Sequence, residues 1–83
     1  MSYRIDWTPA ADQDLARIWN DAPDPNEVTI AVNEIERRLK YNPDVQGESR
    51  SGNVRILIVE PLVVLFRVHH PNQEVTIDSV WEL

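Results

Sequence analysis

The sequence contains no cysteine, only two glycines and fewer basic than acidic residues. Without cysteine the fold has neither disulfides nor a thiolate metal site, which fits a reducing compartment. No apolar run approaches the roughly 18 residues that a membrane-spanning helix needs. Residues 1–4 lead into no signal-peptide core. We therefore expect a cytoplasmic protein that does not enter a membrane.

The excess of acids bears on possible partners. Eight Lys and Arg residues face 14 Asp and Glu residues, a formal charge of −6, which argues against direct binding of free DNA because such binding neutralises phosphates with cations. The charge is uneven, at −6 over residues 1–36, +3 over residues 37–73 and −3 over the last ten. A local basic surface and ordinary solvated faces are both compatible with this pattern.

The length and apolar content predict a single domain over residues 1–83. The chain is 42% hydrophobic, enough for one core, although a chain this short leaves much of its surface in water.

Three β-branched runs dominate the second half of the sequence. They cover residues 54–60, 62–69 and 74–81, separated by turn residues, as expected for consecutive antiparallel strands. The first two runs are apolar at almost every position, which favours central strands.

The first half predicts one strand and two helices. Residues 3–7 alternate apolar and charged side chains, typical of a half-buried strand. Thr8 and Pro9 then suit the cap and first position of a helix that ends near Asn20. A second helix is expected to begin at Asp24-Pro25 and to end at residues 42–43. The expected buried stripes are Ala11, Leu15, Ile18 and Trp19 on the first helix, and Val28, Ala31, Val32, Ile35 and Leu39 on the second.

Residues 43–53 are polar, contain both glycines and are expected to form a loop. The predicted fold is therefore α+β, in the order β-α-α-β-β-β. A helical hairpin packs on one face of a mainly antiparallel four-stranded sheet.

This order resembles the RelE/ParE superfamily of bacterial toxins from type II toxin–antitoxin (plasmid stabilisation) modules. The residues that carry the resemblance are the segments 3–11, 14–19, 42–47, 52–55, 65–68 and 75–80, which together span nearly the whole chain. The resemblance implies a small cytoplasmic toxin that inhibits growth and is neutralised by a cognate antitoxin wrapped around it.

The superfamily divides by target. RelE-like members cut messenger RNA on the ribosome with a set of basic residues, whereas ParE-like members bind DNA gyrase and lack that set. Here Leu57 follows Arg55 on the same strand face, residues 62–64 are apolar, and the chain ends Trp81-Glu82-Leu83 without a basic tail. These departures favour a ParE-like protein, and no catalytic residue is assigned.

Three side chains stay as weak candidates for RNA chemistry, which needs a base, an acid and a cation near the phosphate. They are Arg55, Arg67 and His69, of which the last two share one strand face. The alternative is that they are solvated ends of strands, so whether the protein is an enzyme stays open. His69 and His70 point to opposite faces and lack a third ligand, so no metal and no cofactor are expected.

Arg50, Arg55 and Trp81 are the candidate target-binding residues. The arginines flank a glycine in or beside the polar segment, and Trp81 is expected to be half exposed at a strand end.

Three functions therefore remain in view. They are a ParE-like toxin acting on a protein such as DNA gyrase, a RelE-like ribosome-dependent endoribonuclease, and a non-toxic binding or corepressor module. In each case we expect an antitoxin segment to dock on the helical hairpin as an amphipathic helix or an added strand.

Overall fold

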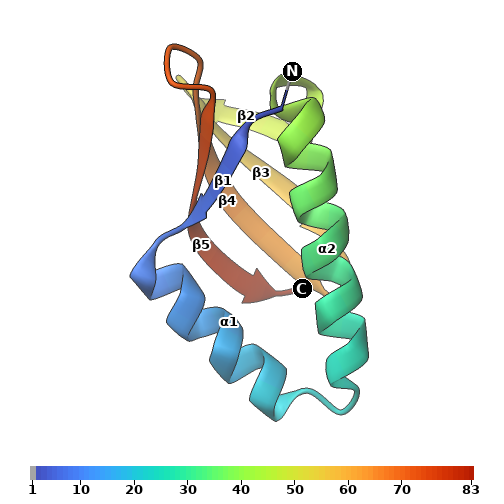
Figure 1. Ribbon diagram of the computed structural model, residues 1–83. Helices are drawn as coiled ribbons and strands as arrows, with labels where there is room; N and C mark the ends of the chain where they lie inside the picture. The colour runs from blue at the N-terminus through green and yellow to red at the C-terminus, as the bar shows by residue number, and fades with distance from the viewer. Residues whose placement is uncertain (1) are drawn as a thin grey trace.

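The computed structural model describes residues 2–83. Five strands, two α-helices and one 3-10 turn follow one another along the chain (Figure 1). Their bounds are β1 (Arg4–Trp7), α1 (Pro9–Asp21), α2 (Pro25–Tyr41), η1 (Pro43–Val45), β2 (Glu48–Ser51), β3 (Val54–Val59), β4 (Leu62–His69) and β5 (Glu74–Glu82). The predicted α+β class and the predicted order are confirmed, with one additional strand.

The additional strand is β2, which lies in the segment predicted to be a loop. The sheet has the order β1-β5-β4-β3-β2, so it contains five strands instead of the predicted four. All four residues of β2 are exposed, and its sequence Glu-Ser-Arg-Ser has no apolar alternation to mark it as a strand. It forms because the exposed outer edge of β3 offers a hydrogen-bonding partner.

The central strands are those that the sequence predicted. β3 and β4 pair antiparallel from Val54↔Arg67 to Val59↔Leu62, and β5 pairs antiparallel with β4. β1 lies beside β5 and is parallel to it, with Ile5 opposite Val75. The chain reaches this position because the two helices carry it from β1 across the sheet before β3 begins.

Both helices begin at the predicted caps. The Thr8 side chain accepts a hydrogen bond from the Ala11 backbone N–H at 3.1 Å, and Asp24 accepts one from Asn26 at 3.1 Å. Each cap is followed by a proline, whose missing N–H would have had no partner in the first turn.

The core lies between the helices and one face of the sheet. The two helices diverge in a V over this face, with α2 spanning most of its length (Figure 1). Phe66, Ile35, Leu39, Leu62 and Ile77 are among the largest fully buried side chains. The predicted stripe of α2 is confirmed, except that Val32 is only half-buried.

Trp19 departs from the predicted stripe of α1. Ala11 and Ile18 are buried, whereas Trp19 is 45% exposed. The helices diverge, so the indole ring stays partly open to solvent at the groove between them.

Within residues 2–83, both helices lie over one face of the sheet, and the opposite face is left open. By register, Ile58 of β3, Val63 of β4 and Trp81 of β5 form one row across this open face. Val63 is nearly buried, while Ile58 and Trp81 are 52% and 42% exposed. The two larger side chains therefore shield the valine between them.

Candidate functional site

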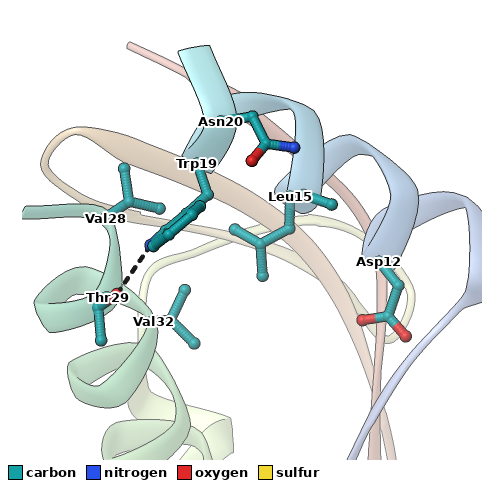
Figure 2. Close-up of a pocket in the computed structure, with 8 residues that line it drawn as sticks. Asp12, Leu15, Trp19, Asn20, Val28, Thr29 and Val32 are labelled. Atoms are coloured by element: carbon teal, nitrogen blue, oxygen red, sulfur yellow. Dashed lines mark hydrogen bonds between the residues drawn. The ribbon is translucent and has the colours of Figure 1, made fainter. Parts of the chain in front are cut away.

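An apolar groove lies between α1 and α2. It has a volume of about 330 Å³ and is lined by Leu15, Trp19, Val28 and Val32, among others. The Trp19 indole lies across the gap and donates its N–H to Thr29 Oγ1 at 3.1 Å (Figure 2). This hydrogen bond fixes the ring while leaving one side of it open. The groove therefore presents a rigid apolar wall suited to an apolar helix face.

Carboxylates lie in and near this groove. Asp12 is among the lining residues, and Asp21 and Asp24 lie at the exposed junction of the two helices. A segment that carries cations beside its apolar side chains would match this charge.

A second groove lies between β1 and α2, and its charged lining residues are mainly basic. Its volume is about 510 Å³, and its lining includes Arg4, Arg37, Lys40 and Tyr41. Arg4 forms an ion pair with Glu74, while the Lys40 ammonium lies 5.8 Å from the centre of the Tyr41 ring.

β1 offers a partly open backbone edge to this second groove, because among the described residues the only backbone hydrogen bond to α2 comes from the Tyr3 N–H, just before the strand, to the Lys40 carbonyl. The N–H groups of Arg4 and Thr8 donate to the carbonyls of Gln73 and Ile77, on the β5 side. In a parallel ladder the alternate residues Ile5 and Trp7 then point their backbone groups away from β5. The groove can therefore accept an added strand.

The same side of α2 carries a tight ion-pair cluster. Glu34 accepts hydrogen bonds from Arg37 at 2.6 Å and from Arg38 at 2.8 Å. These bonds lower the pKa of the Glu34 carboxyl to about 2. The pKa of Arg37 is raised by the same contact.

Arg55 is engaged within the fold. Its Nε donates to the carbonyl of Gln46 at 2.9 Å and its Nη2 to the carbonyl of Gly47 at 3.1 Å. Arg55 aligns with the buried Phe66, which places it on the helix-covered face of the sheet. The residue holds the turn that leads into β2.

Arg67 lies on the open face and is paired with Asp78. Its Nε and Nη2 donate to the two carboxylate oxygens at 2.6 and 3.0 Å. The hydrogen bond and the charge of Asp78 raise the pKa of Arg67 above its usual value. Arg67 therefore stays protonated, with two of its donors occupied by an internal carboxylate.

His69 shares this face with Arg67, as the alternation predicts. It is half-buried and lies opposite Glu74 at the end of β4. Its neighbour His70 lies 2.8 Å from an Asp44 carboxylate oxygen, and its ring stands at 89° to the Tyr3 ring. The three catalytic candidates are thus divided, with Arg55 on one face and Arg67 and His69 on the other.

The remaining candidates lie at the surface. Arg50 is exposed at the bulge in β2, and no ion pair is present for it within residues 2–83. Trp81 is half exposed, as expected, in the apolar row of the open face. Arg50 and Trp81 therefore belong to different strands near opposite sides of the sheet.

Neither a metal centre nor a spanning helix occurs in the part of the chain that the structure describes. Residues 2–83 hold no cluster of three or more potential metal ligands. None of their helices has the length and apolarity required to cross a bilayer.

The sequence interpretation did not anticipate the Arg67–Asp78 pair or the open groove beside Trp19. A signal for the pair was present in β5, where apolar residues fall at positions 75, 77 and 80. The change in spacing from two to three marks a bulge, which turns Asp78 toward Arg67. Nothing in the local sequence indicates that the two helices diverge.

Solved structures from known toxin–antitoxin systems share this architecture. The toxin–antitoxin complex RelBE2 from Mycobacterium tuberculosis matches with a TM-score of 0.79 and 19% identity, over 100% of this chain and 93% of that one. A chromosomal ParDE system from P. aeruginosa matches with a TM-score of 0.74 and 23% identity, over 98% and 96% of the two chains. The YoeB dimer from Staphylococcus aureus matches with a TM-score of 0.66 and 18% identity, over 93% of this chain and 92% of that one.

No family model and no curated protein matches the sequence itself. At these identities the similarity establishes the fold, and the predicted resemblance to the superfamily is confirmed at that level.

Proposed function

We propose that this protein is the toxin of a type II toxin–antitoxin module, that it acts in the cytoplasm by binding a protein target, and that an antitoxin neutralises it. The fold supports this proposal, since the similar solved structures include RelBE and ParDE toxin–antitoxin complexes.

The ParE-like mode of action is favoured by the state of the arginines. Arg55 is bound to two carbonyls on the covered face, and Arg67 is bound to Asp78 on the open face. Cleavage of RNA needs cations that converge on one phosphate. The register separates these two, which supports capture of a protein target over nuclease chemistry.

Two surfaces fit the two docking modes expected for an antitoxin. The α1–α2 groove fits an amphipathic helix with basic residues, and the β1 edge beside Arg37 and Lys40 fits an acidic strand. A short neighbouring gene that encodes a DNA-binding domain and an unstructured tail would identify the module. Removing the C-terminal half of that antitoxin is expected to abolish the complex.

The decisive experiment is induced expression without the antitoxin. We expect growth to stop and plasmid supercoiling to change, with no new cleavages in ribosome-bound messages by primer extension. Arg67→Ala, checked for folding by circular dichroism, should remain toxic. Trp81→Ala should weaken toxicity while antitoxin binding is retained. Healthy growth at high expression would contradict the proposal.

An endoribonuclease is the second candidate, because Arg67 and His69 share the open face of β4. New message cleavages that disappear in Arg67→Ala and His69→Ala would select this function over target capture.

A further inference from the structure

Within residues 2–83, one stretch of β3 is paired with a strand on one side only. β2 pairs with β3 only at Val54, Arg55 and Ile56, although β3 continues to Val59. Leu57, Ile58 and Val59 therefore have β4 on one side and, in the described part of the chain, no strand on the other.

The direction of the backbone groups along β3 follows from one hydrogen bond. The Val68 N–H donates to the Asn53 carbonyl, so position 53 and its alternates 55, 57 and 59 exchange hydrogen bonds with β4. Ile58 then points its N–H and C=O away from β4. Among residues 2–83 no partner for either group is present.

Gly47 is the reason that β2 stops short of Ile58. Its φ is +65°, and a Cβ there would lie 1.9 Å from the Ile56 carbonyl oxygen. The chain turns away from β3 at this glycine, and Arg55 holds the turn through the carbonyls of Gln46 and Gly47. The edge at Ile58 is therefore left open by a specific turn.

The open edge is hollowed and has a carboxylate at each end. A pocket of about 310 Å³ lies there, lined by Gly47, Glu48, Arg50 and residues 56–58. Glu48 lies opposite Ile56 at one end of the open edge, and Glu60 follows Val59 at the other. Both carboxylates are exposed, and in the described chain neither forms an ion pair, whereas Arg50 is the one cation among the lining residues.

We propose that the edge of β3 at Ile58 is a docking site for a short extended segment of a partner protein. The segment adds a strand in line with β2 and forms two main-chain hydrogen bonds with Ile58. It places an apolar side chain on the 52% exposed Ile58 and basic side chains beside Glu48 and Glu60. This site lies apart from both grooves described above and does not depend on the proposed function.

The free protein provides a first test by amide hydrogen exchange. Ile58 should exchange much faster than Leu57 and Val59, whose N–H groups are bonded to β4. Equal protection of the three amides would show that the edge is already covered and would overturn the proposal.

The second test uses the blocked peptide acetyl-Lys-Val-Thr-Val-Lys-amide at millimolar concentration, where so small an interface is expected to bind. Amide shifts should centre on Ile58, and its exchange should slow. Two N-methylated peptides are matched controls, one methylated at the central Thr and the other at both Val residues. Only alternate residues face the edge, so one of the two should lose binding at least about fivefold and the other should not.

Substitutions in the protein test the contribution of the two carboxylates to peptide binding. Glu48→Gln and Glu60→Gln should each weaken binding about two- to fivefold at low salt. Asp6→Asn removes an equal charge from exposed β1 at the opposite edge of the sheet and should have no effect. No shifts with the parent peptide, shifts centred on either groove, or equal binding of the two methylated peptides would refute the site.

Discussion

Gly47 and Gly52 form a matched pair that tests how the turn before β2 is built. Both have a positive φ, +65° and +56°, and both are exposed. A Cβ at Gly52 would have no atom within 4 Å, whereas one at Gly47 would meet the Ile56 carbonyl oxygen at 1.9 Å. An alanine at either site would therefore be strained by the left-handed backbone conformation. At Gly47 it would also clash with the backbone of β3.

The expected magnitudes follow from these two terms. The left-handed conformation costs an alanine about 1–2 kcal/mol, which is the whole effect expected for Gly52→Ala. The clash at Gly47 can be relieved only by moving β2 away from β3, which adds about 1–3 kcal/mol. Gly47→Ala should therefore lower the free energy of unfolding by about 2–5 kcal/mol, a large share of the stability of a small domain.

Urea unfolding followed by tryptophan fluorescence measures both variants. With a slope of about 1 kcal/mol per molar urea, the midpoint should fall by about 1–2 M for Gly52→Ala and clearly further for Gly47→Ala. Equal shifts for the two variants would refute the close approach of Gly47 to β3. Hydrogen exchange of the β2 amides gives an independent check, since only Gly47→Ala should release them.

Three further predictions concern single contacts. Thr8→Ala should lower the free energy of unfolding by about 1 kcal/mol because it removes the cap of α1, while Thr8→Ser keeps the oxygen and should lower it little. Equal losses of stability in urea unfolding would contradict the role of Thr8 as a cap. The Glu34 carboxyl should titrate near pH 2 by carbon NMR, and its pKa should rise toward 4.5 in Arg37→Ala, which removes the strongest of its hydrogen-bonding partners. Because the folded pKa is the lower one, the stability from Glu34 is complete above pH 4.5 and is lost as the pH falls toward 2; a Glu34→Gln variant with the same pH profile would disprove this. A double-mutant cycle on Arg67→Ala and Asp78→Ala should give a coupling of about 0.5–1 kcal/mol, reduced by the partial exposure of both side chains; additive losses would show that the pair is not coupled.

Local patterns were sufficient for most of the elements. The helix caps at Thr8 and Asp24 and the alternation of residues 3–7 act over a few residues, so they can be read from the sequence. The central position of β3 and β4 was also predictable, because their apolar residues cannot face water on both sides. β2 was not predicted, since its pairing depends on the edge of another strand.

The candidate site was predicted less completely. The sequence identified Arg55, Arg67 and His69 as cations or imidazoles near strand ends, and it placed Arg67 and His69 on one face of β4. It did not reveal that Asp78 binds Arg67, because the β5 bulge had to be aligned with β4 first. Trp19 was expected in the core because its spacing fits the stripe of α1, and the angle between the helices left it open.

The sequence by itself determined both helices, four of the five strands, their order and the acidic balance of the chain, since these depend on residues close together or on composition. The tertiary structure alone decided which charges were neutralised, which backbone edges stayed open and how far the helices diverged. Those properties depend on contacts between segments that lie far apart along the chain, and the sequence specifies such contacts only through the packing of the whole molecule.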